Sequence, residues 1–188
     1  MSGGSWTPVS PSTNKLERVL FCGVTLFTRV ELTDAFAIFE QTVAEAARTR
    51  NWDPWVDQYT VDVDYVEHAA GTMRGREQVR PWIWKTMESF PGNHMTSFPA
   101  LWSVIDESTS RVICELDNPM RDPGDGTVIS ATNLSILTYA GDGLWSRQED
   151  VYNPLRFLSA AKKWCKKAQE LGTLTDEAAA WMQQMGVR

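Results

Sequence analysis

Four consecutive stretches of β-strand character, joined by short turn sequences, constrain the fold of this chain most. They cover residues 94–106, 111–120, 128–139 and 144–152. The connections carry strong turn signals, among them Asp122-Pro123-Gly124-Asp125-Gly126 and Gly141-Asp142-Gly143. Strands joined so closely pair with their neighbours in antiparallel hairpins. The pattern therefore predicts an antiparallel meander, with Pro99 marking a bulge or an edge position in its first strand.

Helical patterns lie on both sides of this meander. Before it, Phe36, Phe39 and Val43 recur at helical spacing, which predicts a helix from near Asp34 to about residue 50. Asp53 followed by proline is a favourable N-cap and first turn, so residues 54–59 should form a short second helix. After the meander, Asn153-Pro154 should start a helix that stops at Gly172, and residues 175–185 should form a last one.

A strand and a third helix connect the second helix to the meander. Residues 61–68 alternate, so Val63, Tyr65 and Glu67 share one strand face and His68 lies on the other. Residues 71–75 should turn the chain into a helix that ends near residue 89. The sequence thus predicts a single α+β domain.

Charge and apolar patterning exclude several kinds of partner. A net charge of −6 leaves no extended basic surface for nucleic acid. The lysines at positions 162, 163, 166 and 167 are the one local exception, and their spacing is typical of a solvated helix face. The apolar run at 19–27 is too short to span a bilayer. We therefore expect neither a nucleic-acid nor a membrane partner.

The sequence also predicts no metal and no bound cofactor. Its three cysteines are odd in number and widely spaced, which suggests no disulfide framework and favours a reducing cytoplasm. The two histidines, His68 and His94, lack a Glu or Cys at metal-ligand spacing. No phosphate-binding glycine loop, dinucleotide fingerprint or nucleophile elbow occurs.

The order of these elements resembles the nuclear-transport-factor-2-like superfamily. Within it, the segment Tyr65-Val-Glu-His-Ala-Ala-Gly-Thr-Met-Arg-Gly-Arg-Glu77 is similar to the strand, glycine loop and helix start of SnoaL-like domains. The last strand, Leu144-Trp-Ser-Arg-Gln-Glu-Asp-Val-Tyr-Asn153, is similar to the terminal strand of that family. The similarity covers about residues 33–153.

The resemblance implies a cone-shaped curved antiparallel sheet wrapped around N-terminal helices, with a cavity at its wide end. It divides the chain into an N-terminal arm (1–32), a SnoaL-like cone domain (33–153) and a C-terminal helical extension (154–188). It also implies a small hydrophobic molecule as ligand and a homodimer that packs sheet against sheet. Members include polyketide cyclases, ketosteroid isomerases, limonene-epoxide hydrolases, dehydratases and binding proteins, so the fold does not choose an activity.

Glu67 is the first candidate for chemistry. If its strand face turns inward, this carboxylate ends an apolar wall, which disfavours its charged form and makes it a stronger base. The resemblance points the same way, because ketosteroid-isomerase relatives carry a carboxylate base, usually Asp, near this strand end. His68 competes for the role if the strand bulges. The alternative is that Glu67 lies at an exposed strand end.

Asp117 and Asp150 form a second candidate pair. The epoxide-hydrolase resemblance implies two Asp residues on two strands, bridged by an Arg, that position and deprotonate water. Asp150 fits the second position, but Glu115 stands where the bridging Arg should precede Asp117. This departure argues against epoxide hydrolysis unless Arg111 or Arg147 substitutes. The alternative places both carboxylates on a solvated or dimer-facing strand surface.

Aromatic residues complete the predicted pocket. Tyr65, Tyr152 and Tyr139 could each donate a hydrogen bond to a carbonyl or enolate oxygen. Among the nine tryptophans, Trp55, Trp82 and Trp102 are candidates for ligand contact. Each of these residues could instead serve the core.

Two functions remain open at this point. The first is an enzyme that uses a cavity carboxylate, Glu67 or Asp150, as a general base on a small apolar carbonyl or polycyclic substrate, for isomerisation, cyclisation, dehydration or water addition. The second is a binding or accessory module of the same fold without turnover. Both functions require an open cavity with an acidic side chain of the protein in its wall.

Overall fold

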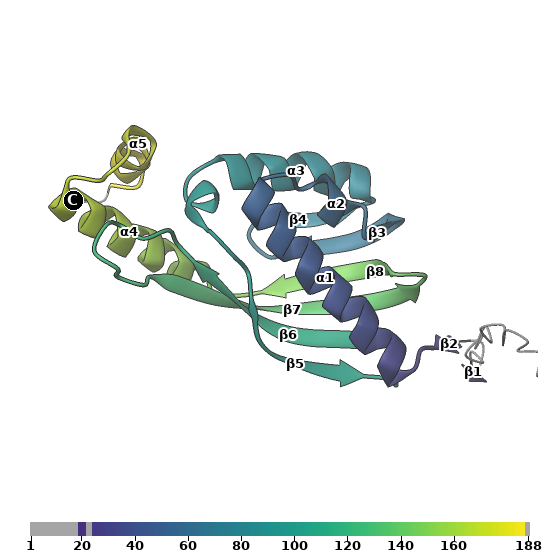
Figure 1. The fold of residues 1–188 in the computed structure, drawn as a ribbon. Helices are drawn as coiled ribbons and strands as arrows, with labels where there is room; N and C mark the ends of the chain where they lie inside the picture. The colour runs from purple at the N-terminus through teal and green to yellow at the C-terminus, as the bar shows by residue number, and fades with distance from the viewer. Residues whose placement is uncertain (1–18, 22–23, 187–188) are drawn as a thin grey trace, which may run out of the picture.

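A six-stranded sheet with a long helix across one face organises the chain (Figure 1). The computed structural model describes residues 19–21 and 24–186. The sheet has the strand order β4-β3-β8-β7-β6-β5. Its strands are β3 (Tyr59–Glu67), β4 (Gly71–Arg74), β5 (Ala100–Asp106), β6 (Arg111–Pro119), β7 (Ser130–Gly141) and β8 (Leu144–Val151). A separate pair, β1 (Val19–Phe21) and β2 (Val24–Leu26), precedes the helix. Of the predicted N-terminal arm (1–32), residues 1–18 and 22–23 lie outside the described residues.

The predicted meander is confirmed. Strands β5 to β8 pair in sequence order and antiparallel. The register shifts between Ala100 and Trp102, directly after Pro99, and β5 is an edge strand of the sheet. A proline cannot donate to a neighbouring strand, so both observations follow from its missing N–H.

The sheet as a whole is mixed, which corrects the expectation of a purely antiparallel sheet. β3 pairs with β8 in parallel, on the side of β8 away from β7. The segment predicted as a turn at residues 71–75 instead forms β4, which folds back antiparallel on β3. The α+β class and the curved, open sheet agree with the prediction (Figure 1).

The N-terminal helices differ from the prediction at their ends. Helix α1 (Arg29–Thr49) begins five residues before Asp34, because the Thr28 side chain accepts a hydrogen bond from the Glu31 N–H and caps it. Helix α2 (Asp53–Val56) ends before Tyr59, which already belongs to β3. Asp53 is the first residue of α2 and not its cap. Helix α3 (Arg76–Glu88) and the single turn η1 (Gly92–His94) follow.

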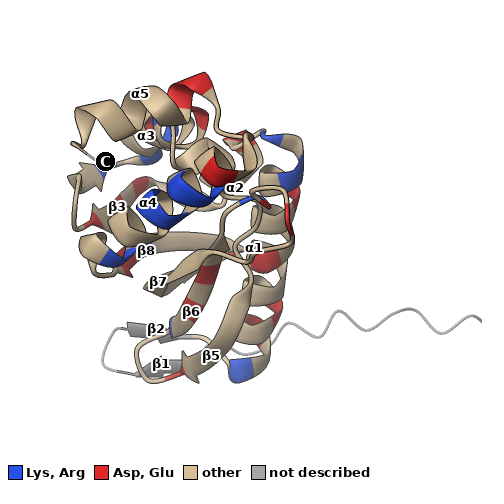
Figure 2. Cartoon of the chain, turned by 90° about the vertical axis from the view of Figure 1, so that its left-hand side faces the viewer, with Lys and Arg blue, Asp and Glu red and all other residues tan. Residues whose placement is uncertain are grey.

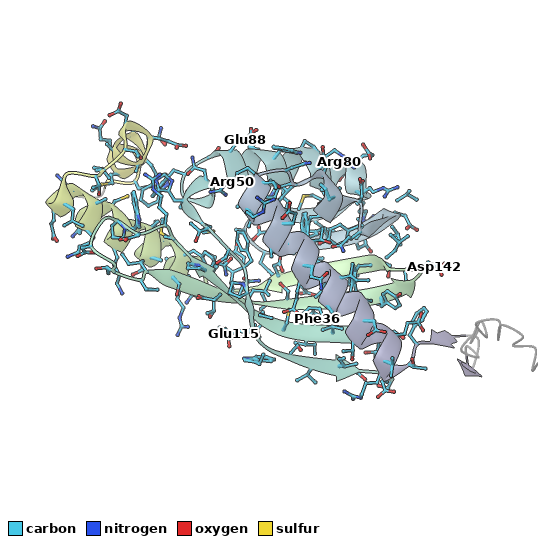
Figure 3. All side chains as sticks on the ribbon, viewed as in Figure 1. Phe36, Arg50, Arg80, Glu88, Glu115 and Asp142 are labelled. Carbon is cyan, nitrogen blue, oxygen red and sulfur yellow. The ribbon has the colours of Figure 1, made fainter. Side chains whose placement is uncertain are left out.

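The main core lies between α1 and the inner face of the sheet. The predicted stripe of Phe36, Phe39 and Val43 is buried there, and Figure 3 shows Phe36 on α1. The Phe39 ring meets the indole of Trp145 edge to face, with 5.9 Å between ring centroids. Val112 and Leu137 of β6 and β7 are fully buried beneath them. This packing closes one half of the sheet.

A second, smaller core ties the C-terminal helices to Phe90 and to Met120 and Ile129, which lie between β6 and β7. Helix α4 (Pro154–Leu171) is capped by the Asn153 side chain and ended by Gly172, as predicted. Helix α5 (Asp176–Gln184) follows it. The Trp164 indole is buried against Phe90 and 4.5 Å from the ring of His94. Burial lowers the pKa of His94 to about 4, so that ring is neutral at pH 7.

The lysine run lies on the outer face of α4, as its spacing predicts (Figure 2). Lys163 and Lys166 are exposed, and Lys167 pairs with Asp125 at 2.8 Å. On the outer face of the sheet, Val104, Ile113 and Ile136 stand side by side across three strands. The pairing of two chains through this face stays a prediction. Among the described residues, no helix has both the length and the apolar character to cross a membrane.

Candidate functional site

A cavity of about 620 Å³ lies between the inner face of the sheet and the helices. Its walls come from α1, α2, α3 and the start of α4, which contribute Phe39, Trp55, Trp82 and Phe157 among others. Its floor is formed by β3, β6, β7 and β8. Such a volume suits a ligand of the size of a drug or a metabolite. The open hollow on which both predicted functions depend is therefore present.

The parallel pairing of β3 with β8 brings two carboxylates together on the floor of this cavity. Glu67 and Asp150 are direct register partners, and both line the cavity. Two residues earlier, Tyr65 and Gln148 are register partners in the same way. Because partners in adjacent strands share one face, all four side chains point to the same side of the sheet. The strand face of Glu67 thus turns inward, which is the condition under which it was a candidate, and only 6% of its surface is exposed.

Asp150 is held by neutral hydrogen-bond donors alone. Its Oδ1 accepts from the Ser135 hydroxyl at 2.5 Å and from the Gln148 amide at 3.0 Å, and its Oδ2 accepts from the Tyr65 hydroxyl. Burial raises the pKa of Asp150, and the negative charge of Glu67 raises it further. The three hydrogen bonds act in the opposite direction because they stabilise the carboxylate. Burial has the larger effect, so Asp150 is a stronger base than an aspartate in water.

Glu67 is held at the turn between β3 and β4. Its Oε2 accepts from the backbone N–H groups of Ala69 and Ala70, at 2.9 and 2.5 Å. Its Oε1 accepts from the Tyr152 hydroxyl. Backbone N–H groups are fixed donors that favour a carboxylate in its charged form. The burial of Tyr152 and the adjacent Glu67 charge raise the pKa of the phenol, so Tyr152 stays a neutral donor at pH 7.

A chain of hydrogen bonds continues behind Asp150 into the core. The Gln148 side chain donates to the Tyr65 hydroxyl at 3.2 Å and accepts from the Tyr59 hydroxyl at 2.5 Å. Burial, followed by the charge of Asp150, raises the pKa of both tyrosines well above the usual value. Both phenols are therefore fixed as neutral donors. The network fixes Asp150 at the cavity, and no lysine or arginine in the described part of the chain forms an ion pair with it.

Aromatic rings cover much of the rest of the cavity. The ring of Tyr65 lies 5.0 Å from that of Trp82 and 5.9 Å from that of Trp55, and the ring of Tyr152 lies 4.9 Å from that of Phe157. The predicted ligand contacts Trp55, Trp82, Tyr65 and Tyr152 thus all border the cavity.

Four predicted site residues lie elsewhere. Asp117 alternates with the buried Leu116 and Asn118, so it faces outward and does not meet Asp150. His68 is on the outer face, 3.0 Å from Glu149. The predicted contact Trp102 is 45% exposed on edge strand β5, where its indole donates to the Glu115 carboxylate. Figure 3 labels Glu115 on this outer side.

Tyr139 is the fourth. Its side chain is buried in the main core, where its ring packs on Trp145. It does not line the cavity. Its predicted role as a donor to a ligand therefore has no support in its position.

Polar residues on the inner face were not singled out by the sequence patterns. Ser135 and Gln148 hold Asp150, and Asn118 and Asn133 line the cavity beside them. The Asn118 amide donates to Asn133 at 2.9 Å, and the Asn133 amide donates to the Ser135 hydroxyl at 3.0 Å. The strand parity that places Val112 and Leu116 inward also places Asn118 inward. Extending that parity would have found this residue.

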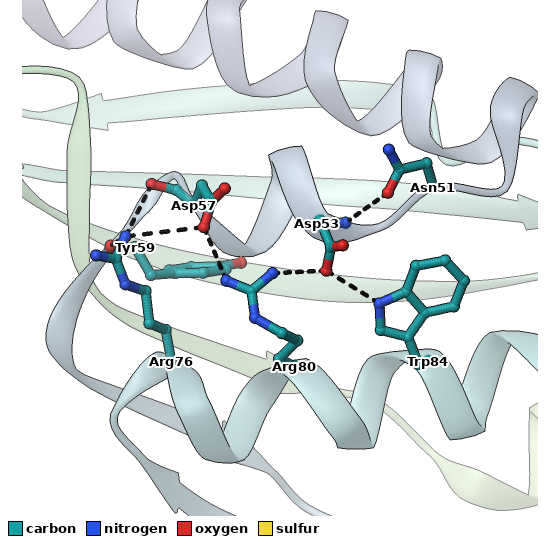
Figure 4. Close-up of polar contacts among 7 residues, drawn as sticks. All are labelled: Asn51, Asp53, Asp57, Tyr59, Arg76, Arg80 and Trp84. Atoms are coloured by element: carbon teal, nitrogen blue, oxygen red, sulfur yellow. Dashed lines mark hydrogen bonds and ion pairs between the residues drawn. The ribbon is translucent and has the colours of Figure 1, made fainter.

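A cluster of charges outside the cavity fixes the helices that carry the tryptophans (Figure 4). The Arg80 guanidinium of α3 donates to Asp53 at 2.6 Å and to Asp57 at 2.8 Å, and the Trp84 indole donates to Asp53 at 3.1 Å. These bonds lower the pKa of Asp53. They hold α2 against α3, and so set the position of Trp55 relative to Trp82.

Comparison with solved structures places this arrangement among known folds. A candidate polyketide cyclase from Xanthomonas campestris superimposes with a TM-score of 0.52 at 16% identity, over 70% of this chain and 97% of that one. A nuclear-transport-factor-2-like protein from Anabaena variabilis gives 0.52 at 14% identity, over 70% and 96%. The chain has the nuclear-transport-factor-2-like fold.

A third structure with this fold contains a small molecule. It is a protein of ketosteroid-isomerase-like fold from Catenulispora acidiphila in complex with trimethylamine, with a TM-score of 0.52 at 21% identity, over 71% of this chain and 93% of that one. Neither a protein-family model nor a curated protein sequence matches the chain. At these identities the likeness establishes the nuclear-transport-factor-2-like fold, and the activity has to be argued from the site.

Proposed function

We propose that this protein is a cofactor-independent acid–base enzyme that acts on a small, mainly apolar carbonyl compound. One observation carries the proposal. Asp150, a carboxylate whose pKa is raised by burial, lines a mainly apolar cavity of about 620 Å³. A base of this kind is suited to removing a proton from the carbon next to a carbonyl group. The similar structures described as a candidate polyketide cyclase and as ketosteroid-isomerase-like fit this class.

In this mechanism Asp150 takes the proton and Tyr65, Ser135 and Gln148 hold its carboxylate in place. Charge then develops on the carbonyl oxygen of the substrate, where a neutral phenol is a suitable hydrogen-bond donor. Tyr152 lies at the edge of the cavity and serves this role once the ligand draws its hydroxyl away from Glu67. Return of the proton to another carbon gives an isomerisation. Attack of the enolate carbon on a second carbonyl of the same substrate gives a cyclisation, in which the C=O π bond opens and the new alkoxide takes back the proton from Asp150.

Water addition to an epoxide is disfavoured by the same geometry. That reaction would need the predicted pair of aspartates and a bridging arginine. Asp117 faces away from the cavity, and among the described residues no arginine lines it.

A turnover screen over ketosteroids and aromatic polyketides tests the proposal. For any compound that turns over, Asp150→Asn should lower kcat/KM by about 10²–10⁴-fold, which is the usual contribution of a general base. Asp117→Asn, on the outer face of the same sheet, makes the same chemical change away from the cavity and should leave kcat/KM unchanged. Turnover that survives Asp150→Asn would refute the role of this residue.

A binding protein without turnover is the second candidate. All four oxygens of Glu67 and Asp150 already accept a hydrogen bond from the protein, as in a purely structural network. Compounds that raise the melting temperature without being converted would favour this candidate. Saturable turnover abolished in Asp150→Asn would exclude it.

A further inference from the structure

The cavity holds two carboxyl groups that no basic residue of the described chain pairs with. Neither Glu67 nor Asp150 forms an ion pair with a described lysine or arginine. Of the described residues that line the cavity, Lys85 alone is basic, and it is exposed on α3. The donors to both carboxylates are instead hydroxyls, an amide and backbone N–H groups. A carboxylate buried without a counter-charge is costly, and a cationic ligand would offset that cost.

The walls around Glu67 suit a cation that is not strongly hydrated. The Tyr152 hydroxyl is bonded to Glu67, and the ring of Phe157 packs on Tyr152. Tyr65, on the same strand face as Glu67, packs on Trp82. The faces of such rings attract alkylated ammonium groups, and several of them together form the aromatic cages that bind quaternary nitrogen. A bare metal ion would find no such complement, and no group of three or more possible metal ligands occurs among the described residues.

The two carboxylates also differ in a way that separates their roles. Glu67 accepts hydrogen bonds from two fixed backbone N–H groups at the turn after β3, whereas Asp150 accepts from side chains and is made more basic by burial. One can thus anchor a positive charge while the other accepts a proton. We propose that the ligand of this cavity carries an alkylated ammonium group, which Glu67 binds between the aromatic side chains of Tyr65, Trp82, Tyr152 and Phe157.

This inference rests on the proposed function for the place where the ligand sits, and it names the class of that ligand. Charge is the property to be tested, so the two probes should differ in charge alone. Benzyltrimethylammonium and neopentylbenzene have the same shape, with a nitrogen cation replaced by a carbon. Their affinities for the full chain can be measured by the quenching of tryptophan fluorescence.

We expect the cation to bind at least ten-fold more tightly than its neutral isostere. Glu67→Gln should reduce this preference at least five-fold, while Asp117→Asn on the outer face should leave it unchanged. If Glu67→Gln does not fold, Phe157→Leu supplies a second measurement, because it removes an aromatic ring that packs on Tyr152 and should also reduce the preference. Equal affinities for the two probes, or a preference that survives both Glu67→Gln and Phe157→Leu, would overturn the inference.

The assay separates this inference from the proposed function because it contains no chemical step. Equal binding of the two probes, together with turnover that depends on Asp150, would overturn the ammonium ligand and leave the enzyme standing. A cation preference that depends on Glu67, in a protein whose turnover does not respond to Asp150→Asn, would do the reverse.

Discussion

Ser135→Ala tests whether hydrogen bonds tune the basicity of Asp150. The Ser135 hydroxyl is fully buried and donates to Asp150 Oδ1 at 2.5 Å, and among the three hydrogen bonds it lowers the pKa of Asp150 most. A hydrogen bond to a charged group contributes about 1.5–3 kcal/mol. One pKa unit corresponds to about 1.4 kcal/mol. Because the pKa reports the difference between the charged and the protonated form, and this hydrogen bond is stronger to the charged form, the substitution should raise the pKa of Asp150 further.

The sign of the stability change follows from linkage. Because the pKa of Asp150 is higher in the folded state than in the unfolded state, folding takes up a proton between these two values, and stability increases as the pH falls through the folded pKa. Because Ser135→Ala raises the pKa of Asp150 in the folded state, it widens the pH range over which folding takes up a proton. Its cost should be about 1.5–3 kcal/mol at pH 7 and should shrink toward the cost of a neutral hydrogen bond, about 1 kcal/mol, near pH 4.

Two measurements decide the matter. The carbon-13 shift of the Asp150 carboxyl, followed against pH, gives the pKa directly, and urea unfolding at pH 7 and pH 4 gives the stability. Ser146→Ala is the matched control, since Ser146 lies on β8 together with Asp150 but donates its hydrogen bond to the Thr138 carbonyl, at 3.4 Å. An Asp150 pKa that stays constant or falls in Ser135→Ala, or a loss of stability equal at both pH values, would refute the reasoning.

Two further predictions concern the elements that frame the cavity. Arg80→Ala should lower the free energy of unfolding in urea by about 0.5–1 kcal/mol, since its ion pairs with Asp53 and Asp57 are partly exposed and therefore screened; a loss no larger than that of Arg48→Ala, in an exposed pair within α1, would contradict a role in holding α2 to α3. Glu177→Ala should lower the free energy of unfolding by about 1–2 kcal/mol, because this carboxylate accepts from the Phe90 N–H at 2.8 Å and from the Asn93 amide at 2.6 Å. The Asn93 bond lowers the pKa of Glu177, so the stabilisation by Glu177 should be present at neutral pH and fade as the pH falls below about 4. Glu170→Ala, at a position without these bonds, is the control and should change the stability little at any pH.

The elements with local signals could be predicted from the sequence. The Asp-Pro-Gly and Gly-Asp-Gly turns gave the hairpins of β6 to β8, and Asn153-Pro154 and Gly172 gave both ends of α4. The missed strand β4 follows a turn at His68–Ala70 that contains neither glycine nor asparagine, so nothing local marked a hairpin there. The early start of α1 rests on Thr28, a capping residue with no charge to draw attention to it.

The candidate site was predictable where strand parity applied and unpredictable where partners are distant. Parity alone placed Glu67 and Tyr65 on one face. In β6 it also placed Asp117 opposite Val112 and Leu116, and the family pattern that promoted Asp117 led to the wrong face. The neighbourhood of Glu67 and Asp150 depends on the parallel pairing of β3 with β8, which no local pattern encodes. Ser135 and Gln148 look like ordinary strand residues until that pairing is known.

The long-range pairing of β3 with β8 also determines at what point in synthesis and folding the site can form. Tyr65 and Gln148, which meet in it, are 83 positions apart in the chain. A fragment or a nascent chain that ends before β8 contains Glu67 and Ser135 but lacks Asp150 and Gln148. The pair of carboxylates is therefore present only in the fully folded chain. Titration with a ligand that needs both acids would measure the fraction of natively folded molecules in a preparation, because misfolded and truncated chains would not bind it.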